Sequence, residues 1–230
     1  MIKTLNIILI LTFILLKSEA YPGSIKKARK NYKYLLYLPQ DYKKRDKEIP
    51  LVIYLHGASC KGSNLNKLKK YGLPYYVSKG KQYEFIIVSP QCPANKSWLS
   101  DDWFEPLYEE LNTKYHIDKH RVYVVGMSMG GYGAWHLAME YPDKIAALVP
   151  LCGGCYDSTR ICRIKQIPVW AFHGALDKAI PISETEKLVA KLLNCNAPVK
   201  YTRVEERGHN IANYFGRQEI YDWLLEQRKE

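Results

Sequence analysis

Short apolar runs alternate with amphipathic stretches along most of the 230-residue chain, and this alternation constrains its fold most. Several runs are continuous in Val, Ile, Leu and aromatic residues, which is typical of parallel strands covered on both faces. We expect strands at residues 32–38, 51–55, 84–88, 122–125, 146–151, 169–172 and 199–204. We expect helices at residues 65–79, 103–115, 130–141, 183–193 and 218–227.

A strand followed by a helix, repeated, predicts one α/β domain with a doubly wound, mostly parallel sheet and helices on both faces. No repeat, low-complexity linker or change in composition marks a second domain. The irregular stretch at residues 152–167 is long enough for a loop and too short for a separate lid domain. Ligands of such sheets collect at the carboxyl ends of the strands, so we expect an open site there.

The first 20 residues have the pattern of a secretory signal peptide. Lys3 supplies the positive start, residues 5–16 are mainly apolar, and Ser18-Glu19-Ala20 offers small residues for cleavage. We expect cleavage after Ala20, a mature domain at residues 21–230 and a secreted or periplasmic protein. An uncleaved anchor is the alternative, but the apolar stretch is shorter than the roughly 20 residues that span a bilayer, so stable membrane insertion is not expected.

The chain is strongly basic. Its formal net charge is +11, and loss of the first 20 residues leaves +10. Such a charge favours nucleic acid, anionic membranes or acidic polysaccharides as partners. Net charge alone, however, indicates how charged partners are attracted to the protein and does not indicate its function. The lysines are scattered and accompany no nucleic-acid-binding motif, so no nucleic-acid partner is expected.

Six cysteines follow Ala20, and an exported chain of this kind can form up to three disulfides. Cys60 and Cys92 each follow an expected strand, so they either lie near one another above the sheet or are buried free thiols. The spacing of Cys152, Cys155 and Cys162 does not match a zinc pattern, and no metal is expected.

The segment Gly126-Met127-Ser128-Met129-Gly130-Gly131 follows an apolar run and precedes a helical stretch. This is the context of a nucleophile elbow, a sharp strand-to-helix turn that exposes a serine. Glycines on either side leave space where a side chain would collide with neighbouring backbone. Ser128 is therefore the candidate nucleophile.

A serine hydroxyl needs a base to take its proton. In folds with a nucleophile elbow, the catalytic residues occur along the chain in the order serine, acid, histidine. His209 follows the last expected strand and is the candidate base. His136 fits packing on the helix after Ser128, and His173 fits the turn before Gly174.

Asp177 is the candidate acid that holds the imidazole in one tautomer. It lies between the serine and the histidine and shortly follows the strand expected at residues 169–172. Asp143 and Asp157 fall in the same interval, but Asp143 fits a helix end and Asp157 lies in the irregular stretch.

Two backbone N–H donors are needed for the oxyanion, one after the nucleophile and one on the turn after an earlier strand. Met129 and Ala58 fit these positions, and His56 fits a residue that braces the Ala58 turn. Trp98 and Trp103 follow another strand. They either line an aromatic or sugar-ester pocket or pack in the core.

Together these features resemble the α/β-hydrolase superfamily, and more narrowly its single-domain carboxylesterases. These are also labelled predicted peptidases or phospholipase/carboxylesterases, and are similar to feruloyl esterases and polyhydroxybutyrate depolymerases. The resemblance covers the chain from about residue 32 to the end. It is carried by Leu55-His56-Gly57-Ala58, Ser89-Pro90-Gln91-Cys92-Pro93, Gly126-Met127-Ser128-Met129-Gly130-Gly131-Tyr132-Gly133, Pro168-Val169-Trp170-Ala171-Phe172-His173-Gly174 with Asp177, and Gly208-His209.

The resemblance implies ester hydrolysis through an acyl-enzyme, without metal or organic cofactor. The chain departs from its relatives at Ser59-Cys60-Lys61-Gly62, where they usually have a glycine and an acidic residue. The function hypothesis is a serine carboxylesterase acting on small-molecule or polysaccharide-linked esters. The alternatives are a serine peptidase or amidase on the same triad, and a non-catalytic binder of anionic polymer.

Overall fold

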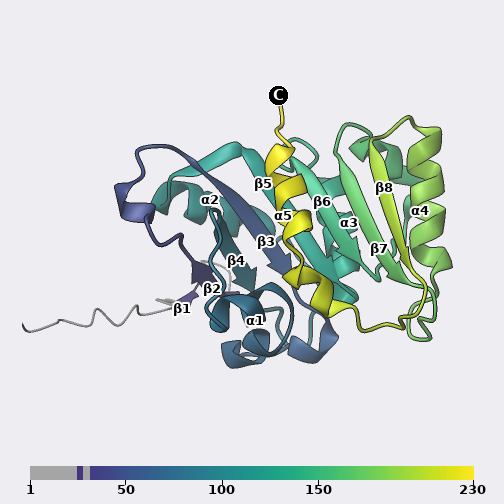
Figure 1. Cartoon of the computed structure of the whole chain (residues 1–230), viewed down its shortest axis with the longest axis horizontal. Coiled ribbons are helices and arrows are strands. Elements are labelled where there is room, and N and C mark those ends of the chain that lie inside the picture. Colours follow the sequence, from purple (N-terminus) through teal and green to yellow (C-terminus); the bar gives the residue numbers. More distant parts are fainter. Residues whose placement is uncertain (1–24, 28–31) are drawn as a thin grey trace, which may run out of the picture.

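The computed structural model describes residues 25–27 and 32–230, so the predicted signal peptide and the start of the mature domain lie outside the described residues. The strands are β1 (Ile25–Lys27), β2 (Lys33–Tyr37), β3 (Ile49–Leu55), β4 (Ile86–Pro90), β5 (Ile117–Met127), β6 (Ala147–Leu151), β7 (Val169–Gly174) and β8 (Val199–Val204). They form one sheet in the order β1-β2-β4-β3-β5-β6-β7-β8 (Figure 1). β2 pairs antiparallel with both β1 and β4, and the strands β3 to β8 are parallel to one another.

Helices cover both faces of this sheet. They are α1 (Gly72–Ser78), α2 (Phe104–Lys114), α3 (Met129–Glu140), α4 (Ser183–Asn194) and α5 (Gln218–Glu226). Leu51 and Ile53 of β3 pack in the core with α2, α3 and α4, whereas Val52 and Tyr54 pack with α1 and α5 (Figure 1). Because both faces are buried, β3 reads as one continuous apolar run. The predicted doubly wound sheet is confirmed, and the described residues form no separate lid.

None of the helices in the described part of the chain is long and apolar enough to cross a membrane. The helix expected at residues 65–79 is interrupted. A 3₁₀-helix, η3 (Leu65–Lys70), is followed by α1, which begins at Gly72. Gly72 has φ +60°, and a Cβ atom there would lie 2.0 Å from the Tyr54 hydroxyl oxygen. A glycine is therefore required at this break.

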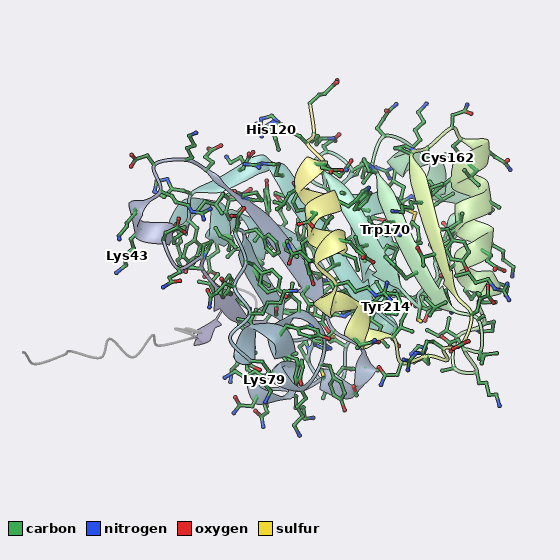
Figure 2. All side chains as sticks on the ribbon, in the orientation of Figure 1. Lys43, Lys79, His120, Cys162, Trp170 and Tyr214 are labelled. Atoms are coloured by element: carbon green, nitrogen blue, oxygen red, sulfur yellow. A yellow bond between two sulfur atoms is a disulfide. The ribbon has the colours of Figure 1, made fainter. Side chains whose placement is uncertain are left out.

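All six cysteines are described, and one disulfide forms among them. It joins Cys162 of the short helix η4 (Ser158–Ile164) to Cys195 after α4, on the α4 side of the sheet (Figure 2). The stretch at residues 152–167 is thus tied to α4. The cysteines with free thiols are Cys60, Cys92 and Cys152, which are buried, and Cys155, which is half-buried. Cys60 and Cys92 are buried free thiols, and their segments also lie side by side, since the Gly62 N–H donates to the Cys92 carbonyl oxygen at 2.9 Å.

Candidate active site

Ser128 lies on the sharp turn between β5 and α3, with φ 59° and ψ −124°. Residues other than glycine rarely adopt such a conformation, and it costs energy. A Cβ atom on Gly126 would lie 2.2 Å from the Gly130 carbonyl oxygen, and one on Gly130 would lie 1.9 Å from that of Leu55. Only glycine fits at both positions, so the turn presents Ser128 at the carboxyl edge of the sheet.

His209 connects Ser128 to Asp177. Its Nε2 atom is 2.8 Å from Ser128 Oγ, and its Nδ1 atom is 2.7 Å from Asp177 Oδ2. An ionised carboxylate only accepts hydrogen bonds, so Nδ1 carries the proton and Nε2 accepts from the serine hydroxyl. The turns after β5, β7 and β8 therefore bring the three predicted residues into one hydrogen-bonded chain.

The Asp177 side chain is fully buried. Burial raises its pKa, but hydrogen bonds from the Ile180 N–H, from His209 and from the Ala179 N–H more than compensate. The net result is a pKa below the usual value for an aspartate, which keeps Asp177 ionised at neutral pH.

His173 lies on the other side of Asp177 and is fully buried. Its Nδ1 atom is 2.7 Å from the Thr185 hydroxyl, and its Nε2 atom is 3.0 Å from the Ile180 carbonyl oxygen and 3.2 Å from Asp177 Oδ2. The Thr185 hydroxyl donates in turn to the Gly153 carbonyl oxygen at 2.6 Å. His173 thus braces the Asp177 turn, a contact that the sequence does not reveal.

The two predicted oxyanion donors both begin helical turns. Ala58 begins η2 (Ala58–Cys60) and Met129 begins α3. The first N–H of a helical turn has no acceptor within that turn. A Cβ atom on Gly57 would lie 3.6 Å from Ser128 Cβ, so the Ala58 turn lies against the serine.

Trp98 and Trp103 belong to the core, and their prediction as substrate-binding residues is wrong. Their exposed fractions are 1% and 3%. Trp98 Nε1 donates to the His56 carbonyl oxygen and Trp103 Nε1 to that of Trp98, each at 2.9 Å. His56 Nε2 accepts from the Cys92 N–H at 3.0 Å, and burial lowers the pKa of His56 to about 4. The loop after β4 folds inward, which buries these indoles.

A pocket of about 390 Å³ adjoins Ser128 and His209. Besides the η2 turn, its walls include Tyr54 and Tyr71, and beyond His209 they include Asn210 and Ala212. None of these four residues was predicted to line the site. The position of Asn210 next to His209 was a usable signal, whereas the position of Tyr71 depends on the break before α1.

Asp177 and His209 also lie near a thiol. Atoms of Cys152, Asp177 and His209 that can bind metals all lie within 4.8 Å of one another. Metal binding needs a thiolate and free ligand atoms. Burial raises the pKa of Cys152 to about 12, so its thiol stays protonated at neutral pH. His209 Nδ1 is hydrogen-bonded to Asp177 Oδ2, so neither atom is free to bind a metal. The three residues therefore fit a hydrogen-bonded cluster better than a metal centre.

The sheet order, the sharp turn after β5 and the loops that converge beside it define the α/β-hydrolase fold. Residues 101–218, just over half of the chain, match the phospholipase/carboxylesterase family. The chain belongs to this family.

Two of the curated relatives are a depolymerase and an esterase. The chain is 29% identical to poly(3-hydroxyalkanoate) depolymerase C of Paucimonas lemoignei over 123 residues, which cover 46% of this chain and 28% of that protein. It is 26% identical to a bifunctional acetylxylan esterase/xylanase of Neocallimastix patriciarum over 144 residues, 60% of this chain and 20% of that one. The chain thus spans less than a third of the length of these curated relatives.

Among solved structures, the fold resembles a thermostable esterase. The TM-score is 0.70 at 30% sequence identity, and the match covers 86% of this chain and 60% of that one. This likeness agrees with the family match and supports the α/β-hydrolase fold.

Proposed function

We propose that this chain is a serine carboxylesterase in which Ser128 is the nucleophile, His209 the general base and Asp177 the group that orients His209. The observation that carries the proposal is the hydrogen-bonded chain from Asp177 through His209 to Ser128, at 2.7 and 2.8 Å. A serine is a useful nucleophile only when a base is placed to take its proton, and this arrangement meets that requirement.

In the first half of the reaction, Ser128 Oγ attacks the ester carbonyl carbon while its proton passes to His209 Nε2. The N–H groups of Ala58 and Met129 donate to the oxyanion. Collapse of the tetrahedral intermediate breaks the bond to the alcohol oxygen, which takes the proton from His209. The alcohol leaves and the acyl group stays on Ser128.

In the second half, water attacks the acyl-enzyme and gives its proton to His209, which returns it to Ser128 as the carboxylic acid leaves. Asp177, kept ionised by its lowered pKa, stabilises the imidazolium form of His209 in both halves. The steps need no metal or organic cofactor. The substrates we propose are small-molecule or polysaccharide-linked esters, in line with the acetylxylan esterase among the relatives.

Hydrolysis of p-nitrophenyl acetate and methyl ferulate tests the proposal. We expect Ser128→Ala to lower kcat by about 10⁴- to 10⁶-fold, because only binding and the oxyanion donors remain. Ser100→Ala, a change at an exposed serine, is the matched control. An inactive wild-type protein, or full activity in Ser128→Ala, would refute the proposal that the chain is a serine esterase.

Two further measurements separate the alternatives. A fluorophosphonate probe should label the wild type and not Ser128→Ala, whereas a non-catalytic polymer binder would not react. A p-nitroanilide with the same acyl group should react far more slowly than the ester. The reverse order would favour a peptidase or amidase.

We also propose that the protein is exported after cleavage behind Ala20. The Cys162–Cys195 disulfide supports this, because disulfides persist in oxidising compartments. Edman sequencing of the mature protein should begin at Tyr21, and an intact Met1 would contradict cleavage.

A further inference from the structure

A second hollow of about 420 Å³ lies next to the pocket beside Ser128. Tyr71, Asn210 and Ala212 line both, so the two hollows adjoin one another. We name the second hollow the α1 groove. It lies between α1 and η5 (Ala212–Gly216). In Figure 2 the label Lys79 marks the end of α1 at the lower edge of the molecule. The site therefore has room for a substrate much longer than a simple ester.

The α1 groove presents two tyrosine rings to solvent. Tyr71 is 48% exposed and Tyr75 is 37% exposed. Tyr75 packs edge-on against Tyr76, whose hydroxyl donates to the Asn213 carbonyl oxygen at 3.1 Å. Tyr75 therefore packs on a ring that is itself anchored. Accessible aromatic faces suit the C–H faces of sugar rings, and their hydroxyls can bind glycan oxygens.

The charge of the α1 groove is positive. Lys70 and Arg207 line it, and no aspartate or glutamate of the described chain lines either hollow. Glu205 pairs with Arg203 at 3.0 Å. Glu206 precedes Arg207 in the sequence and is not part of the lining. Cations on both walls favour a ligand that carries carboxylates, in keeping with the basic charge of the whole chain.

We propose that the α1 groove binds an acidic polysaccharide, a glycan whose sugars bear uronate carboxylates, and presents its ester substituents to Ser128. Tyr71 and Tyr75 stack against successive sugar rings, and Lys70 and Arg207 pair with the carboxylates. This inference rests on the proposed esterase function for the cleavage itself. A neutral glycan would leave the cations unpaired, and a phospholipid headgroup would leave the tyrosine faces unused.

Binding can be measured without turnover on the Ser128→Ala protein. Calorimetry with unesterified oligogalacturonate and with xylo-oligosaccharide of equal length compares an acidic with a neutral glycan. We expect at least tenfold tighter binding of the acidic one, weakened by salt. Tyr75→Ala and Arg207→Gln should each weaken it at least fivefold.

Two matched controls lie outside the groove. Tyr156→Ala removes a tyrosine that is 82% exposed, and Lys43→Gln removes a cation far from α1 (Figure 2). Both should bind as the parent does, and equal Tm values will show that all variants are folded. Equal affinity for the two glycans, or no loss in the groove variants, would overturn the proposal. Binding to phosphatidylglycerol vesicles that depends on the groove residues, in place of glycan binding, would also overturn it.

Turnover separates this proposal from the esterase proposal. In the active protein, the ratio of kcat/KM for acetylated oligogalacturonate to that for acetylated xylo-oligosaccharide should exceed ten and fall at least fivefold in Arg207→Gln. If the protein hydrolyses p-nitrophenyl acetate but the kcat/KM ratio for the two acetylated oligosaccharides is near one, the groove proposal is refuted and the esterase proposal stands. Oligogalacturonate binding with no hydrolysis of any ester would refute the esterase and leave the groove as a binding site.

Discussion

Aromatic residues lie on two sides of Ser128, and their surroundings differ. On the closed side, which consists of His56, Trp98 and Trp103, every ring is buried and each indole N–H donates to a backbone carbonyl. On the open side, which consists of Tyr71 and Tyr75, the residues are 48% and 37% exposed. An aromatic residue near the site can therefore contact substrate only if its ring is exposed to solvent, and otherwise it packs in the core.

The two sides differ because the backbone near each side takes a different course. Trp98 packs directly on α3, where a Cβ atom on Gly133 would lie 2.6 Å from Trp98 Cβ. On the open side, the positive φ of Gly72 ends the 3₁₀-helix and starts α1 in a new direction, which leaves Tyr71 beside the pocket. Variants on the closed side should therefore act through folding, and variants on the open side through substrate.

The largest expected effect is on the closed side. Trp98→Ala should lower the free energy of unfolding by about 4 kcal/mol, because it leaves a large buried cavity. Urea denaturation followed by circular dichroism measures this, and Trp98→Phe gives a milder variant if Trp98→Ala does not fold. A loss below about 1 kcal/mol would show that Trp98 is not a core residue.

His56 should make stability depend on pH. Its pKa is lowered to about 4 in the folded protein, so the unfolded chain binds one more proton between pH 6.5 and 4. Stability should therefore fall as the pH falls through this window, by about 3 kcal/mol in total.

Urea denaturation at several pH values, on the wild type and on His56→Gln, isolates this contribution. Glutamine can still accept from the Cys92 N–H but does not titrate. His136, whose pKa burial also lowers, contributes in the same direction in both proteins and cancels in the comparison. Equal pH dependence in the two proteins would contradict the prediction.

Much of the fold follows from the sequence, because continuous apolar runs and the helices between them specify a covered parallel sheet. The strand expected at residues 199–204 has the observed bounds. β1 was missed because Ile25–Lys27 offers a single apolar residue. The prediction of one helix at residues 65–79 was wrong because the apolar spacing gives no sign of the sharp turn at Gly72, which packs against Tyr54.

The site was predictable to the extent that chain order is informative. Ser128, Asp177 and His209 were selected by their chain order and by their places after three of the expected strands, and the structure brings their side chains together. Burial of a whole loop is a tertiary property, so Trp98 looked as suitable for substrate as for core. The role of Tyr71 was hidden for the same reason, because its exposure depends on packing between α1 and β3.

Thiol reactivity should report how tightly the closed side is packed. Cys92 adjoins the closed side, because its N–H donates to His56. Burial raises the pKa of Cys92 to about 11, so only about one thiol in a thousand is ionised at pH 8. Iodoacetamide should label Cys92 at least about 100-fold more slowly in the native protein than in urea. Mass spectrometry in urea without reductant should show four alkylated cysteines, since Cys162 and Cys195 are bonded to each other. Rapid native labelling of Cys92 would mean that the closed side opens.

The smallest effect should fall on the open side. Tyr75→Ala should change the free energy of unfolding by about 1 kcal/mol or less, because the lost ring contacts are partly offset by the higher helix propensity of alanine. Tyr76→Ala is the matched variant one residue along α1. It should cost more, since the Tyr76 hydroxyl binds Asn213 and its ring lies against Gly216. A loss of about 3 kcal/mol in Tyr75→Ala would make Tyr75 a structural residue like Trp98. Weaker glycan binding in that variant would then report damaged packing, and the distinction between the two sides would fail.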